Sequence, residues 1–191
     1  MQQSEAKSVI EAVIFAADRP VTAGQLVSIM VDMDNESIIQ LINELKQDYD
    51  REGRSFQIVE IANGYQIRTR DKYAPWIKSF YTTEISSRLS ISALEALAII
   101  AYRQPATRAE VEEIRGVNSD SVLRTLQERN LIEVIGRKQA PGKPMIYGTT
   151  EDFLMHFGLK DLSELPSIDE IERMLGTPKE EMRSEIREIL G

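Results

Sequence analysis

The chain carries one helical pattern twice, about 85 residues apart. In each copy an apolar helix pattern runs up to a proline, and a threonine two residues later begins a second helix pattern. These residues are Pro20 and Thr22 in the first copy and Pro105 and Thr107 in the second. Gln or Glu follows each threonine after three residues, which predicts a capping box at the start of each second helix. The repeat therefore favours two small domains of one design over a single larger domain.

The rest of the first copy follows the order of a winged-helix domain. A third helix is predicted over residues 36–51, where apolar residues recur at helical spacing. Residues 56–61 and 65–69 alternate apolar and polar side chains, and the Asn63-Gly64 pair between them is typical of a hairpin turn. Three helices followed by a two-stranded hairpin is the winged-helix order. Residues 71–81 are expected to add a short closing helix.

The second copy repeats this order. Its first helix, opened by a capping box at Ser92, is apolar on nearly every side, so it is either buried all round or docks a partner. Asn118 is placed to cap the third helix. Residues 132–135 and 145–147 are expected to form the wing strands. The loop between these strands is basic and contains Arg137, Lys138 and Lys143.

These patterns predict a mainly α fold with small β-hairpins (α+β), built as two tandem winged-helix domains. The expected boundaries are residues 1–81 for the N-terminal domain, 82–89 for a polar linker, 90–158 for the C-terminal domain and 159–191 for an acidic tail. The tail could fold back on the domains, order on a partner or remain mobile.

Charge argues against DNA binding as the main task. The net charge is −8, whereas proteins that grip nucleic acid nonspecifically usually carry a basic excess. The predicted third helix of the first copy has more acidic than basic side chains, so it would repel phosphate. We therefore expect direct DNA binding to be weak or absent.

Catalytic and metal-binding patterns do not emerge from the sequence. The chain has no cysteine, and its single histidine, His156, lacks a second ligand for a metal site. The glycines form no phosphate-binding loop, and no spacing of carboxylates singles out a catalytic pair. We expect no catalytic residue, no cofactor and no metal, and hence no enzyme.

The sequence also predicts a cytoplasmic protein. No apolar run approaches the ~20 residues that cross a bilayer. The first residues lack the basic and then apolar pattern of a signal peptide. We therefore expect no membrane partner.

Several stretches of the second copy resemble the bacterial segregation and condensation protein B family. The resemblance rests on residues 97–105 (LAIIAYRQP) and 108–120 (RAEVEEIRGVNSD). Shorter matches follow at residues 136–138, 141–144 and 147–150. The first copy fits more loosely, through residues 10–16 and 64–69.

This resemblance implies a non-enzymatic subunit of the bacterial SMC condensin complex, which supports chromosome condensation and segregation. Members of the family form homodimers through the N-terminal winged-helix domain. They bind the kleisin subunit, segregation and condensation protein A, and reach the SMC ATPase indirectly through it. The protein would then be associated with the nucleoid through the complex.

Polar residues of the second copy are the expected kleisin contacts. They are Tyr102, Arg103, Gln104, Arg108, Glu112, Arg115, Asn118 and Asp120. Some also have an ordinary structural interpretation, because Arg108 and Glu112 are spaced for a surface ion pair and Asn118 for an N-cap. For dimerisation the expected contacts are apolar residues of the first copy, namely Val31, Met33, Tyr49 and Trp76.

A winged-helix transcriptional regulator is the alternative function. In that case Arg137, Lys138 and Lys143 of the basic wing would contact DNA phosphates. Such a regulator would bind duplex DNA with a steep salt dependence, whereas a kleisin-binding scaffold would bind its protein partner tightly and DNA poorly.

Overall fold

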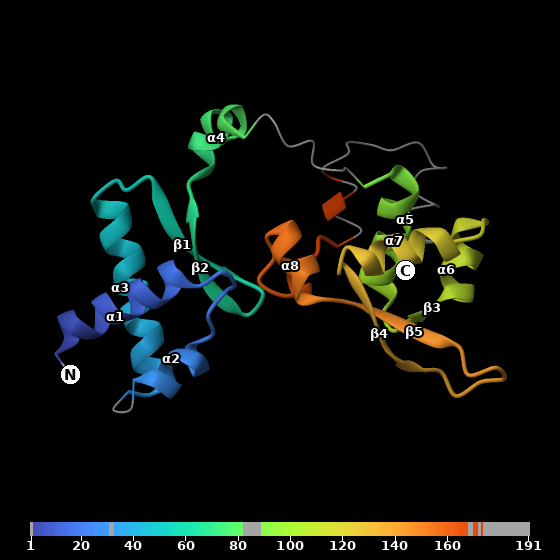
Figure 1. Cartoon of the computed structure of the whole chain (residues 1–191), viewed down its shortest axis with the longest axis horizontal. Helices are drawn as coiled ribbons and strands as arrows, with labels where there is room; N and C mark the ends of the chain where they lie inside the picture. The colour runs from blue at the N-terminus through green and yellow to red at the C-terminus, as the bar shows by residue number, and fades with distance from the viewer. Residues whose placement is uncertain (1, 31–32, 82–88, 168–169, 172, 174–191) are drawn as a thin grey trace. The chain divides into compact units, whose positions relative to one another are not determined.

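The computed structural model describes residues 2–30, 33–81, 89–167, 170–171 and 173. The chain divides into two compact units, Met1–Ser86 (unit 1) and Ser87–Gly191 (unit 2). Each unit combines helices with a small antiparallel sheet in the winged-helix order (Figure 1). The predicted fold class, mainly α with small β-hairpins in two tandem winged-helix domains, is confirmed. Residues 82–88 of the predicted linker lie outside the described residues.

Unit 1 consists of three helices, a hairpin and a short terminal helix. In chain order these are α1 (Gln3–Ala16), α2 (Ala23–Ile29), α3 (Asn35–Arg51), β1 (Phe56–Ile61), β2 (Gly64–Thr69), the 3₁₀ helix η1 (Asp71–Tyr73) and α4 (Ala74–Phe80). The core forms where α1 and α3 pack together under the hairpin. The predicted inner face of α3 packs into this core, where the following residues are all buried: Ile38, Leu41, Ile42 and Leu45.

The hairpin of unit 1 turns one residue earlier than its sequence suggests. Asn63-Gly64 was the expected turn pair, but Gly64 is already the first residue of β2 and pairs with Ile61. The two turn residues are Ala62 and Asn63, with φ of 47° and 56°. These left-handed conformations are the ones that a two-residue hairpin turn requires.

Gly64 is needed for a close approach of two backbones. A Cβ at this position would lie 3.0 Å from both the carbonyl carbon and the Cβ of Pro20, and 3.1 Å from the carbonyl carbon of Val21. Val21 and Tyr65 exchange two backbone hydrogen bonds, of 2.9 and 2.8 Å. The segment before α2 is therefore held against the outer edge of β2.

The expected closing helix does not close unit 1. Residues 71–81 form η1 and α4, and neither element has a buried residue. Figure 1 shows α4 standing apart from α1, α2 and α3 at the end of β2.

Unit 2 repeats the design and adds a third strand. Its elements are α5 (Ile91–Arg103), β3 (Ala106–Thr107), α6 (Arg108–Arg115), α7 (Asp120–Glu128), β4 (Ile132–Arg137), β5 (Met145–Thr149), α8 (Glu151–Phe157) and the 3₁₀ helix η2 (Leu162–Glu164). The sheet has the order β3-β5-β4, with a bulge between Val134 and Gly136. The predicted wing strands are confirmed and extend by two residues each. Strand β3 was not predicted, because two residues carry no readable alternation.

The N-cap of helix α5 lies two residues before the predicted one. Ser90 is the N-cap, and its hydroxyl accepts a hydrogen bond from the Ala93 backbone N–H at 3.2 Å. The capping box predicted at Ser92 is therefore wrong, because Ser92 already lies within the helix. Burial is extensive but incomplete, since Ile91 is 78% and Leu94 45% exposed.

Both predicted capping boxes at the second helices are confirmed. In unit 1 the Gln25 side-chain oxygen accepts from the Thr22 backbone N–H at 2.8 Å, and the Thr22 hydroxyl accepts from the Gln25 N–H at 3.2 Å. In unit 2 Glu110 accepts from the Thr107 N–H at 2.7 Å, and Thr107 from the Glu110 N–H at 3.3 Å. The repeat thus extends to individual hydrogen bonds.

Candidate partner-binding surfaces

Two of the predicted contact residues anchor the end of α5. The Gln104 side-chain oxygen accepts a hydrogen bond from the Thr149 backbone N–H at 2.8 Å, which ties the helix end to β5. The Tyr102 hydroxyl donates to the Pro166 carbonyl oxygen at 2.7 Å. Partial burial raises the pKa of Tyr102, so the hydroxyl remains a donor at neutral pH. The start of the predicted tail is therefore held against unit 2.

Five further predicted residues gather where α6 meets α7. Arg108 donates to Asp120 at 2.9 Å and lies 3.6 Å from Glu112, so the expected i,i+4 pair is present. Glu112 also accepts from the Ser119 backbone N–H at 2.9 Å. The Asn118 side chain accepts from the Asp120 N–H at 3.1 Å, but the N-cap of α7 is Ser119, so the predicted N-cap at Asn118 is wrong by one residue.

Arg115 is the most enclosed member of this group. Its side chain is only 5% exposed, although it carries a permanent charge. It donates to the Ser119 hydroxyl at 2.6 Å and to Glu95 of α5 at 3.3 Å. Arg115 therefore joins α5, α6 and the start of α7. Its side chain holds these helices together and contributes little to the exposed surface.

A hollow lies between α5, Pro105 and α6. It has a volume of about 360 Å³. Its lining residues are Ile99, Arg103, Pro105, Ala106, Glu110, Glu113 and Ile114. Apolar side chains form one part of the lining and charged side chains the other, which suits an apolar side chain flanked by polar groups.

Of the predicted contacts, only Arg103 lines this hollow. The prediction concentrated on polar residues and missed the apolar lining formed by Ile99, Pro105 and Ile114. The repeat itself was a signal for this site. Residues at the matching positions of unit 1, among them Pro20 and Ile29, line a second hollow of about 480 Å³.

The basic wing is partly neutralised within unit 2. Lys138 lies 2.5 Å from Glu110 of α6, and Arg137 donates to the Lys143 carbonyl oxygen at 3.1 Å. The hydrogen bond from Lys138, together with those from Thr107, lowers the pKa of Glu110 to about 2. The pair is thus ionised at neutral pH, and Lys138 already has a partner other than phosphate.

The four residues predicted for dimerisation have different surroundings. Val31 lies outside the described residues, and Met33 is partly buried against the core. Tyr49 is 1% exposed and donates its hydroxyl to Glu11 at 2.6 Å, so its side chain belongs to the core of unit 1. Burial, followed by Glu11, raises the Tyr49 pKa. Trp76, in contrast, is 70% exposed.

Unit 1 also exposes large aromatic residues that were not predicted as dimer contacts. Phe15 is 77%, Phe80 81% and Tyr81 63% exposed. Phe15 lies off the buried face of α1 that contains Ile10 and Ile14, and this irregularity was readable from the helical spacing. A single exposed apolar residue needs no partner, whereas a contiguous patch of such residues marks an interaction surface.

The described residues offer no support for metal chemistry. No group of three or more His, Asp or Glu side chains among them could hold a metal ion. His156 is exposed and lies beside Phe157, with ring centroids 5.1 Å apart. None of the described helices is long and apolar enough to cross a membrane.

Comparison with known proteins places these features in one family. Residues 8–168 match the family model described as segregation and condensation complex subunit ScpB. The segregation and condensation protein B of Syntrophotalea carbinolica is 45% identical over 170 residues, which covers 89% of this chain and 85% of that protein. The protein of the same name from Desulforamulus reducens is 48% identical over 168 residues, covering 88% of this chain and 92% of that protein.

One related solved structure is a dimer of a ScpB N-terminal domain in complex with a ScpA peptide. It is 30% identical to this chain, with a TM-score of 0.38, and the match covers 41% of this chain and 92% of that one.

Proposed function

The chain belongs to the family of segregation and condensation complex subunit ScpB, and we propose that it acts in the bacterial SMC condensin complex as a homodimeric, non-enzymatic subunit that binds the kleisin. We infer these partners from membership of the family. The kleisin would be segregation and condensation protein A, and the SMC ATPase would be reached through it. Unit 1 would carry the dimer contacts and unit 2 the kleisin contacts. The protein would be cytoplasmic and associated with the nucleoid through the complex.

The observation that carries the kleisin proposal is the hollow of unit 2. Its lining of Ile99, Pro105 and Ile114 can receive an apolar side chain, and Arg103 and Glu113 stand among the lining residues with opposite charges. The network around Arg115 holds α5, α6 and α7 together, so this surface is preorganised for a partner. A peptide segment from the kleisin would bury an apolar anchor there.

The polar residues around the α6–α7 junction would add specificity. Arg108 and Asp120 are each about half exposed, so they can exchange their mutual bond for bonds to a partner. Gln104, Glu112 and Arg115 act through the fold, because their side chains are occupied by bonds within unit 2.

The regulator alternative is not favoured. Lys138 of the wing is paired with Glu110. The reading helix of a winged-helix domain would be α3 or α7, and α3 carries an acidic excess. Neither element provides the basic stripe that phosphate binding requires.

Light scattering after size exclusion, with and without the kleisin from the same genome, tests the proposal. We expect a dimer that enters a stable complex with the kleisin. Ile114→Lys should weaken kleisin binding at least tenfold, about 1.4 kcal/mol, because it places a charge in the apolar lining. Glu113→Arg is a milder second variant, and Glu128→Arg on the exposed face of α7 is the control.

A wild-type protein that ignores the kleisin would overturn the proposal. In that case duplex binding should be measured at several salt concentrations, since the wing would become the next candidate. Unchanged kleisin affinity in both hollow variants, with folding verified by circular dichroism, would remove the hollow as the binding site while leaving the partner in place.

A further inference from the structure

Helix α4 presents an aromatic stripe that no described residue of unit 1 covers. Trp76 and Phe80 are one helical turn apart, and they are 70% and 81% exposed. Tyr73 extends the stripe, with its ring centroid 6.4 Å from that of Trp76, and Tyr81 packs edge-on against Phe80 at 5.1 Å. Figure 1 shows this helix away from the body of unit 1. A helix of seven residues gains most of its stability from packing, so it requires a surface.

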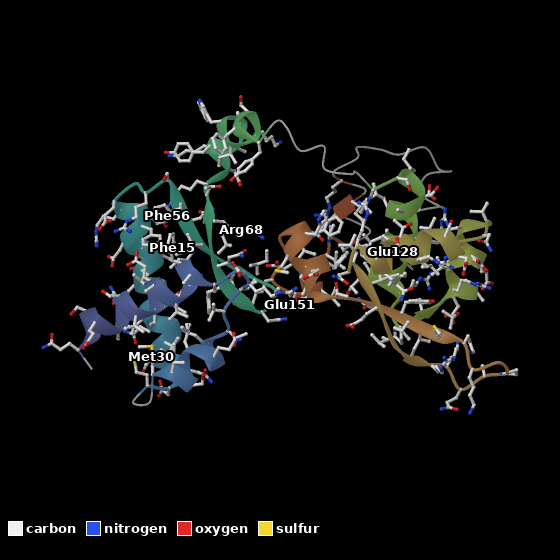
Figure 2. The ribbon with its side chains drawn as sticks, viewed as in Figure 1. Phe15, Met30, Phe56, Arg68, Glu128 and Glu151 are labelled. Carbon is white, nitrogen blue, oxygen red and sulfur yellow. The ribbon has the colours of Figure 1, made fainter. Side chains whose placement is uncertain are left out.

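A second uncovered apolar surface lies on the body of the same unit. It is a hollow of about 250 Å³. Its lining residues are Ser8, Glu11, Ala12, Phe15, Tyr49, Phe56 and Ile67. Figure 2 shows Phe15 and Phe56 next to each other at this site. Phe15 is 77% exposed, so the hollow is unoccupied within one copy.

We propose that α4 of one copy docks into the hollow of a second copy, and that the second copy returns the same contact. This inference rests on the proposed homodimer and names its surfaces. Each copy carries both the stripe and the hollow. Two copies related by a two-fold axis can therefore fill each other's hollow, which gives a closed dimer and not a growing filament. The exchange of a terminal helix between two copies is a form of domain swapping.

The exposed aromatic side chains supply a large part of the area that a stable dimer buries. An aromatic side chain can bury about 150–250 Å². Trp76, Phe80, Tyr81 and Phe15 are each at least 63% exposed, so together they can remove roughly 400–600 Å² per copy from water. Two copies then contribute roughly 800–1,200 Å² from these side chains alone, before the walls of the hollow are counted. A specific interface needs roughly 1,000 Å² in total.

The chemistry of the hollow also fits an aromatic helix. Its walls are apolar except at Ser8 and at Glu11, whose carboxylate already accepts from Tyr49 and Arg54. A carboxylate retains further acceptor sites. It can therefore receive the indole N–H of Trp76, which usually needs a partner when the ring is buried.

The first test is the oligomeric state of Trp76→Ala/Phe80→Ala, measured by light scattering on the full chain. We expect the wild type to be a dimer and the variant to dissociate at least tenfold more readily. Phe157→Ala on α8, a residue 46% exposed in the other unit, is the control and should stay dimeric. A monomeric wild type would remove the proposed homodimer itself. A dimeric wild type with an equally tight variant would overturn only the role of α4.

The second test separates the reciprocal contact from other two-fold arrangements. The chain has no cysteine, so single cysteines give unambiguous crosslinks. Ser79→Cys on α4 and Ser8→Cys at the hollow should crosslink to each other when the two variants are mixed and treated with a short bismaleimide. Ser121→Cys, on the exposed face of α7, should not react with either. Crosslinking of Ser79→Cys only with itself would show that α4 packs against α4 of the second copy and would overturn the proposal.

Discussion

Unit 1 and unit 2 place a glutamate at the same position of their first helix, and the two glutamates hold different arginines. Glu11 in α1 binds Arg54, which follows α3, and also accepts from Tyr49. Glu95 in α5 binds Arg115 from α6. The repeat therefore preserves the backbone and the carboxylate but redirects the ion pair. Unit 1 ties its first helix to the start of the hairpin, whereas unit 2 ties its first three helices to one another.

The two matching hollows differ in charge at two wall positions. In unit 1 the wall positions are filled by Gln25 and Ser28, whereas unit 2 has Glu110 and Glu113 there. Unit 2 thus adds two carboxylates to its lining, whereas unit 1 has uncharged side chains at these two positions beside the charged pair Asp18 and Arg19. A charged surface provides selectivity for one partner, and an apolar one provides area. This difference agrees with a kleisin site on unit 2 and a dimer contact on unit 1.

The largest expected effect is the loss of stability when either of two buried glycines is replaced by alanine. Gly64→Ala should destabilise unit 1 by about 2–3 kcal/mol, because the new methyl group would press on the backbone of Pro20 and Val21. Gly148→Ala in unit 2 should cost less, about 1–2 kcal/mol, since its methyl would meet side chains of Gln104 and Ile135 rather than backbone, although the Gln104 oxygen is held by its bond from Thr149. Urea unfolding followed by hydrogen–deuterium exchange reports each unit separately. Equal losses would contradict this assignment.

A smaller effect distinguishes the two arginines. Arg115→Met should cost unit 2 about 2 kcal/mol, because it leaves Ser119, which is fully buried, without its donor. Arg54→Met should cost unit 1 less than this, since that side chain is 37% exposed and its pairs are screened. The measurement is the midpoint of thermal unfolding for each variant. A larger loss for Arg54→Met would reverse the comparison.

The smallest effect concerns the two capping boxes. Glu110→Gln gives unit 2 the residue that unit 1 uses at Gln25, so the box should persist while the ion pair with Lys138 is lost. We expect a cost of about 1 kcal/mol at pH 7, a value reduced for solvent because Glu110 is 41% exposed. Gln25→Glu, the reverse exchange in unit 1, should change stability by less than about 0.5 kcal/mol.

The same pair predicts a pH dependence with a defined sign. The folded pKa of Glu110 is about 2, below its ordinary value of 4.5. The unfolded chain therefore takes up the proton first as pH falls, and the stabilisation present above pH 4.5 is lost between about 4.5 and 2. Glu110→Gln should flatten the pH dependence of stability in that window, and above pH 6 it should lower stability by a constant amount. An unaltered acid limb in the variant would show that Glu110 contributes nothing there.

Much of the fold could be predicted because its signals are local. The capping boxes at Thr22 and Thr107 and the inner face of α3 depend only on residues within one or two helical turns. Predictions from the sequence were wrong where other residues determine the role of a position. Gly64 resembles a turn glycine, yet its small size serves the approach of Pro20. Ser92 lost its role because Ser90 offers an earlier cap.

The candidate surfaces were harder to predict for the same reason. The polar residues at 102–120 were readable as unusual, but which of them bind within the unit depends on where α5, α6 and α7 meet. Arg115 looks like a surface cation in the sequence and is nearly enclosed in the structure. The exposure of Phe15 was readable from helical spacing, whereas that of Trp76 depends on the absence of an inner face for α4 within unit 1.

The two hydrogen bonds between Val21 and Tyr65 also bear on how unit 1 folds. They connect segments that are distant in the sequence, so α2 and the hairpin cannot reach their final places independently. Such pairing raises the contact order of an otherwise helical domain and slows its formation relative to a simple helical bundle. It also joins helices and sheet into one cooperative block, so the amides of Val21 and Tyr65 should exchange with solvent only when the whole unit opens.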